Sequence, residues 1–215
     1  MSTTPTPSAE SILHAASAIV VGDGVETLGY GALAQRLGVT PAQVSEVFPV
    51  FESLLAALFT RETGDLARVI AANVERDPRG GLPSRIFGYA LGAIYEHPFA
   101  RALYLEDPAA LNRIMRSIDG VVVVPDLTIH PGLLPALQAA GMARADVDPA
   151  AIAAVISVLG SGIAMSAPGQ LLDAVTEGLV TMLERGVDAD VTDTTPGKLV
   201  FARYAETLAV TTRQG

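Results

Sequence analysis

The residues from Leu33 to Val47 form two short helical patterns separated by a single glycine, and this arrangement restricts the fold more than any other feature of the chain. The apolar residues of LAQRLGV fall on one face of a first helix, which Gly38 ends. Thr40 is a good N-cap, and Pro41 is favoured at the start of the helix that follows. Two helices joined by such a short turn predict a helix-turn-helix unit.

The rest of the chain has the composition and periodicity of an all-α protein. Half of the 215 residues are hydrophobic and only 5% are aromatic, and VVVVP at 121–125 is the only strand-like run. We expect three helices in a small N-terminal unit and a larger helical body after it. The helices are expected at 10–21, 29–37, 41–47, 51–74, 83–95, 99–105, 108–118, 133–140, 149–164, 170–185 and 198–210.

Charge and cysteine usage exclude several classes of protein. The absence of cysteine rules out disulfides and thiolate metal sites, and the net charge of −9 argues against nonspecific attraction to nucleic acid or anionic lipid. The first residues, MSTTPTPSAE, have no basic start or apolar run, so no signal peptide is predicted. The uncharged run 150–172 lacks flanking Lys, Arg, Trp or Tyr and contains Pro168–Gly169. We therefore expect no membrane span, and a cytoplasmic protein.

No catalytic or metal-binding pattern is evident. The three histidines, His14, His97 and His130, do not share a helical i, i+4 face. The acidic loop that contains Asp188 and Asp190 lacks the glycine and closing glutamate of a calcium loop. We therefore predict no metal, no cofactor and no enzymatic activity.

Residues 12–55 resemble, without a gap, the N-terminal domain of the TetR (tetracycline-repressor-like) family. The likeness covers ILHAA, Gly24, LAQRLGV, Phe48–Pro49, and Glu52 ahead of Leu54–Leu55. It implies an all-α homodimer in which a small effector alters the spacing of two DNA-reading heads. The implied function is a ligand-responsive transcriptional regulator, most simply a repressor. The implied organisation is a disordered leader at 1–8, a DNA-binding domain at 9–50 and an effector-binding and dimerisation domain at 51–215.

The sequence departs from the family where family members touch double-stranded DNA. The resemblance places the DNA contacts at Arg36, Thr40, Pro41, Ala42, Gln43, Ser45 and Glu46. The family usually has basic or hydrogen-bonding residues at positions that here hold Gly29, Gly31, Pro41, Glu46 and Phe51. Up to residue 60, five acids stand against Arg36 alone, a net charge of −4. Because phosphate contacts supply much of the affinity for DNA, an alternative stays open: a protein of the same fold that no longer binds DNA and instead binds a small molecule or a protein partner.

The body is expected to hold an apolar effector pocket and a dimer interface. Candidate pocket residues are aromatic, methionine or histidine side chains: Phe87, Tyr89, Tyr95, Tyr104, Met115, His130 and Met165. Two apolar helical stripes predict the dimer interface: Ile152, Val155, Ile156, Leu159 and Ile163 on one helix, and Leu171, Val175, Leu179 and Met182 on the next. For both sets the alternative is ordinary packing in the core of one protomer.

Overall fold

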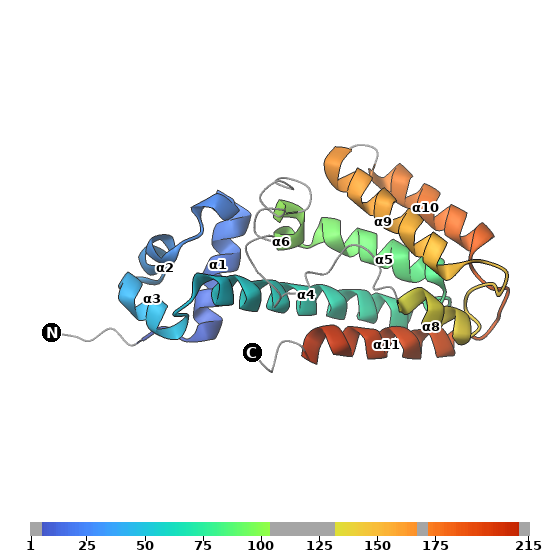
Figure 1. The fold of residues 1–215 in the computed structure, drawn as a ribbon, viewed down its shortest axis with the longest axis horizontal. Coiled ribbons are helices and arrows are strands. Elements are labelled where there is room, and N and C mark those ends of the chain that lie inside the picture. The colour runs from blue at the N-terminus through green and yellow to red at the C-terminus, as the bar shows by residue number, and fades with distance from the viewer. Residues whose placement is uncertain (1–5, 104–131, 167–171, 211–215) are drawn as a thin grey trace. The chain divides into compact units, whose positions relative to one another are not determined.

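The computed structural model describes residues 6–103, 132–166 and 172–210 (Figure 1). The all-α prediction is confirmed, because these ranges contain helices and turns and no strand, only an isolated antiparallel bridge between Ala143 and Asp188. The helices are α1 (Ala9–Asp23), η1 (Val25–Thr27), α2 (Tyr30–Leu37), α3 (Pro41–Val47), α4 (Phe51–Arg76), α5 (Pro83–Glu96), α6 (Pro98–Arg101), α8 (Leu133–Ala139), α9 (Pro149–Ser166), α10 (Leu172–Gly186) and α11 (Thr195–Val210).

The predicted helices within these ranges are present, and most of their ends agree closely with the expected ones. The helix expected at 99–105 ends as an α-helix at Arg101, and two residues of wider π-type turn follow it. The helix expected at 108–118 and the VVVVP run lie outside the described residues.

The chain folds into two compact units, and the boundary falls inside α4. The first unit runs to Glu62 and resumes at Pro98, whereas the second holds Thr63–His97 and the described chain after residue 131. The sequence placed a boundary after residue 50. The first unit is larger than that, because Phe59 of the long helix packs edge-to-face on Phe99, with ring centroids 5.6 Å apart. The assignment of roles to 9–50 and 51–215 stays a prediction.

The first unit is held together by apolar side chains from α1, α2, α3, α4 and α6. Ile12, Leu33, Val44, Leu54 and Leu58 are fully buried in one cluster. Their helical spacing puts each on the inner face of its helix. Ser8 begins α1 by accepting a hydrogen bond from the Ser11 N–H at 3.1 Å, which satisfies an otherwise unpaired amide.

The second unit is organised around α5, which packs on α10, while α8 contacts both α9 and α11. The start of α5 is capped from a distant part of the chain. The carboxylate of Asp188 accepts hydrogen bonds from the Ser84 N–H at 2.9 Å and the Ser84 hydroxyl at 2.5 Å. Asp188 is buried, and its burial raises its pKa although the bonds from Ser84 act in the opposite direction. The sequence indicated only a solvated acidic loop here, because nothing near Asp188 in the chain identifies its partner.

Within the described ranges, no single helix is both long enough and apolar enough to cross a membrane. By length and composition α3 and α4 pass that test only as a pair, and they meet at a 68° bend.

Candidate functional site: the helix-turn-helix head and a polar cavity

The turn between α2 and α3 has the geometry that its sequence predicts. Gly38 has φ 68°, a left-handed conformation that favours glycine, and the Val39 N–H donates to the Ala34 carbonyl at 3.0 Å. Thr40 and Gln43 form a reciprocal capping box: the Gln43 N–H donates to Thr40 Oγ1 at 3.3 Å, and the Thr40 N–H donates to Gln43 Oε1 at 2.9 Å. With Val44 fully buried beneath it, α3 is held on α2 and its opposite face is left open.

The junction between α3 and α4 is fixed by an aromatic pair that the sequence analysis did not identify. The Tyr30 hydroxyl donates to the Phe48 carbonyl at 2.7 Å, and the Tyr30 ring meets Phe51 edge-to-face at 5.5 Å. Burial, followed by the negative charge of Glu52, raises the pKa of Tyr30, so the phenol stays protonated and can donate this bond. Phe51, one of the departures from the family pattern, therefore contributes packing where a basic side chain is expected.

The seven predicted DNA-contact residues lie along α2, the turn and α3, and most are exposed. Arg36, Pro41, Ala42 and Glu46 face solvent, but only Arg36 carries a positive charge. The remaining polar groups have partners within the head. Thr40 Oγ1 lies 3.1 Å from Gln43 Oε1, and the Ser45 hydroxyl donates to the Ala42 carbonyl at 2.9 Å. The exposed face formed by α2, the turn and α3 thus presents few groups able to bind phosphate.

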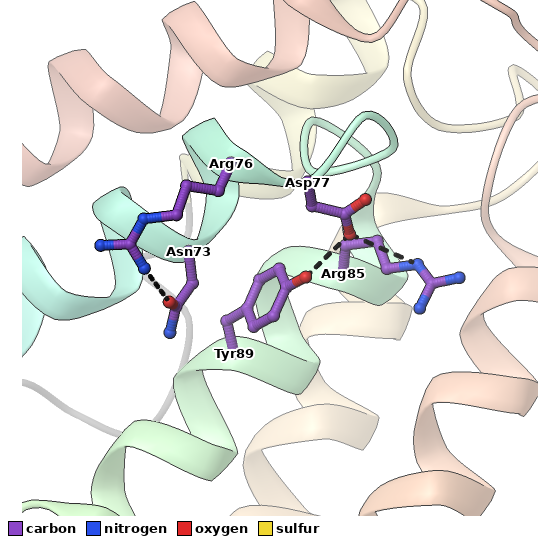
Figure 2. Close-up of a pocket in the computed structure, with 5 residues that line it drawn as sticks. All are labelled: Asn73, Arg76, Asp77, Arg85 and Tyr89. Atoms are coloured by element: carbon purple, nitrogen blue, oxygen red, sulfur yellow. Dashed lines mark hydrogen bonds and ion pairs between the residues drawn. The ribbon is translucent and has the colours of Figure 1, made fainter.

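The second unit has a shallow cavity of about 470 Å³, widely open to solvent, between the end of α4 and the first half of α5. It is lined by Asn73, Arg76, Asp77, Arg85 and Tyr89 (Figure 2). Of the predicted pocket residues that the structure describes, only Tyr89 lines it. This cavity is polar, and the apolar effector pocket expected from the sequence stays a prediction. Apolar periodicity identifies helix faces, but it does not show which charged residues meet where one helix turns into the next.

The other predicted pocket residues lie elsewhere. Phe87 is buried in the core, with 4% of its surface exposed. Tyr95 is half-buried, and its buried hydroxyl oxygen makes no hydrogen bond to the described part of the chain. Burial raises the pKa of Tyr95. Tyr104, Met115 and His130, and the side chain of Met165, lie outside the described residues.

Asp77 is the centre of the cavity's hydrogen bonding. Its carboxylate accepts from the Arg79 N–H at 2.8 Å and from the Tyr89 hydroxyl at 2.8 Å, and Arg85 Nε lies 3.8 Å from the same oxygen that Tyr89 contacts. Burial alone raises the pKa of Asp77. The two hydrogen bonds and the charges of Arg85 and Lys198 outweigh that effect, so the pKa lies below its ordinary value. Burial and the bond to Asp77 raise the pKa of Tyr89. At neutral pH the pair is therefore a carboxylate and a neutral phenol.

The predicted dimer residues divide into buried and exposed ones. Ile156 and Leu179 are each only 6% exposed and pack into their own protomer. Val155 and Met182 are 50% and 65% exposed, and Val158, which the predicted stripe omitted, is 72% exposed. Ile152, Leu159 and Val175 are half-buried, and the side chains of Ile163 and Leu171 lie outside the described part. The most exposed apolar side chains of α9 are thus Val155, a member of the predicted stripe, and Val158, which lies outside it.

No group of three or more His, Asp or Glu that could hold a metal ion occurs among the residues that the structure describes. In the described residues, the first unit contains a helix-turn-helix and the second unit consists of helices.

Three solved structures share this architecture over most of their length. One, reported as the molecular basis for control of antibiotic production by bacterial hormones, is 26% identical, with a TM-score of 0.60 over 84% of this chain and 97% of its own. A TetR-family transcriptional regulator from Rhodococcus sp. is 18% identical, with a TM-score of 0.56 over 82% and 96%. A transcriptional regulator from Rhodococcus sp. Rha1 is 20% identical, with a TM-score of 0.54 over 86% and 100%. No protein-family model matches the sequence, and no curated protein matches it. The chain has the TetR-like fold.

Proposed function

We propose that this protein is a ligand-responsive transcriptional regulator, a repressor that acts in the cytoplasm and binds operator DNA as a homodimer. The proposal rests on the geometry of the helix-turn-helix formed by α2 and α3. A left-handed Gly38, the capping box of Thr40 and Gln43, and a buried Val44 hold α3 with its outer face open. In helix-turn-helix proteins the second helix, held in this way, enters the major groove. The structural neighbours described as transcriptional regulators support this reading.

The test is binding to the DNA upstream of the protein's own gene, measured by fluorescence anisotropy at several salt concentrations. We expect binding at about 50 mM salt that weakens steeply as salt is added, because phosphate contacts release counterions. Arg36 is exposed and is the only Lys or Arg between residues 6 and 60, and Arg36→Gln removes its charge. We expect this change to weaken binding by about tenfold or more and to make the log–log salt slope shallower by roughly 2, one contact for each head of a dimer.

The matched control for this assay is Arg79→Gln, which removes the same charge from the second unit, where Arg79 pairs with Glu184 at 2.7 Å. Its affinity and salt slope should equal those of the unmodified protein. Equal losses for the two variants would mean that net charge, rather than a contact by Arg36, determines the affinity.

One observation favours a second candidate function, a TetR-like binding protein that has lost DNA binding and retains a small molecule or a protein partner. Glu46 is exposed on the outer face of α3, and Thr40, Gln43 and Ser45 are engaged in local hydrogen bonds. A carboxylate beside phosphate is repelled. Absence of any binding at about 50 mM salt, where phosphate attraction is strong, would favour this candidate.

Tyr95 supports a ligand site in the helical body, because a buried hydroxyl that has no partner among the described residues can gain one from a ligand. We expect Tyr95→Phe to leave the free energy of unfolding unchanged or to raise it by up to about 1 kcal/mol, since the buried hydroxyl makes no bond. Tyr89→Phe is the matched comparison. It removes the bond to Asp77 and should lower stability by about 1 kcal/mol. Urea denaturation measures both, and a loss of more than about 1 kcal/mol in Tyr95→Phe would show that its hydroxyl is bonded.

A further inference from the structure

The cavity between α4 and α5 has more hydrogen-bond donors than acceptors. Its lining contains two guanidinium groups, Arg76 and Arg85, and one carboxylate, Asp77, a net charge of +1 in a chain whose total is −9. The Asn73 amide adds two N–H donors. A lining of this kind is complementary to a ligand that carries negative charge and accepts hydrogen bonds.

Asp77 does not use up these donors. One of its oxygens is bonded to the Arg79 N–H and the other to the Tyr89 hydroxyl. Arg85 lies 3.8 Å away, close enough for attraction but too far for a hydrogen bond. The carboxylate therefore holds Tyr89 and offsets the charge of Arg85, while the donors of Arg85 stay available.

The spare donors lie on both sides of Tyr89. Arg85 Nε is buried and makes no hydrogen bond among the residues that the structure describes, and an unsatisfied buried donor of a charged group is costly. On the other side, the only hydrogen bond that Arg76 makes within the described chain is to Asn73 Oδ1, at 3.3 Å. Figure 2 shows the two guanidinium groups pointing to opposite sides of the Tyr89 ring.

We propose that this cavity binds a small organic monocarboxylate. Its carboxylate lies against Arg76 and Asn73, its apolar body lies along the Tyr89 ring, and the positive charge of Arg85 adds attraction from the other side of the ring. A single negative charge balances the +1 of the lining, whereas a phosphate dianion would leave an excess negative charge beside the ionised Asp77. The half-buried aromatic ring favours a ligand with a flat or hydrocarbon body. That this ligand is the effector rests on the proposed function, but its binding does not.

The experiment is a titration of the full chain, without DNA, by benzoate and separately by inorganic phosphate, with ionic strength held constant by chloride. The side-chain N–H signals of the arginines are followed by NMR. We expect benzoate to shift the Arg76 and Arg85 signals in a saturable way, with a Kd of the order of 1 mM, since one charged pair and one ring contact give modest affinity. Arg76→Gln should raise that Kd about tenfold. Arg76 is exposed, so this variant should fold normally.

Arg79→Gln is the matched control, because Arg79 lies in the same turn, pairs with Glu184 and does not line the cavity. Its benzoate affinity should be unchanged. The absence of a saturable shift with benzoate up to about 50 mM, phosphate binding tighter than that of benzoate, or equal losses in Arg76→Gln and Arg79→Gln would each overturn the proposal. If benzoate binds but leaves the affinity for DNA in the anisotropy assay unchanged, the site is retained and its role as the effector site is removed.

Discussion

Replacing Gly81 by alanine is expected to lower the free energy of unfolding by about 3 kcal/mol, near the upper end of the usual cost of forcing extra atoms into a packed site. A β-carbon at Gly81 would collide with the carbonyl oxygen of Thr194 and lie 2.9 Å from the Lys198 amide nitrogen. Both are backbone atoms at the start of α11, so no side-chain rotation can relieve the clash. For a chain of this length, the melting temperature should fall by roughly 6–12 °C.

Two hydrogen bonds hold the start of α11 against the end of α4 and the turn that follows it, so the backbone atoms next to Gly81 cannot easily move. Thr194 Oγ1 donates to the Pro78 carbonyl at 2.8 Å, and Lys198 Nζ donates to the Glu75 carbonyl at 2.8 Å. A β-carbon at Gly197 would in turn meet the Gly81 carbonyl and lie 2.7 Å from Met142 Cγ. The turn between α4 and α5 thus lies directly against the start of α11.

Gly92→Ala is the control, because Gly92 lies inside α5 and a β-carbon there would meet no atom within 4 Å in the described part of the chain. It should raise stability by about 0.5–1 kcal/mol, the difference in helix propensity between glycine and alanine. Thermal and urea denaturation of both variants measure the difference. A Gly81→Ala protein as stable as the unmodified chain would contradict the close contact with α11.

Replacing Val158 by aspartate is expected to separate a homodimer into protomers while leaving the protomer folded. Val158 on α9 is 72% exposed and Met182 on α10 is 65% exposed. Around them, Ala154, Ala174 and Gly178 are small and exposed, so a second copy could approach closely. An aspartate buried without a partner at such an interface costs at least about 3 kcal/mol, so the dimer Kd should rise by roughly 100-fold or more.

Sedimentation velocity over a range of concentrations measures this effect against a protomer mass of 22.2 kDa. Val69→Asp, at a 44% exposed position on α4, introduces the same charge away from α9 and α10 and should leave the dimer intact. Equal dissociation of the two variants, or an unmodified protein that is monomeric at all concentrations, would rule out the proposed interface.

Much of the local structure follows from the sequence, because it depends on residues close together in the chain. Gly38 ends α2 and Thr40 begins α3 as predicted, since a glycine in a left-handed conformation and a capping side chain need only their neighbours. The long α4 and the buried apolar residues of the first helices follow from helical periodicity for the same reason. The resemblance of residues 12–55 to the TetR family extends that reading to the fold, which the structure confirms.

The tertiary structure decided the features that join distant residues. Asp188 caps α5 from 104 positions away in the chain. Phe99 packs on Phe59, and this contact adds α6 to the first unit. Tyr30 fixes the α3–α4 junction through its contacts with Phe48 and Phe51. The tertiary structure also decided the polar cavity around Tyr89 and the orientation of α9 about its own axis, which exposes Val158 and buries Ile156. By itself the sequence determined where helices begin and end and which side chains are apolar. Which helix face is covered, and which charges meet in a cavity, depends on how the helices pack, and the apolar pattern of α9 is too uniform around its circumference to specify that.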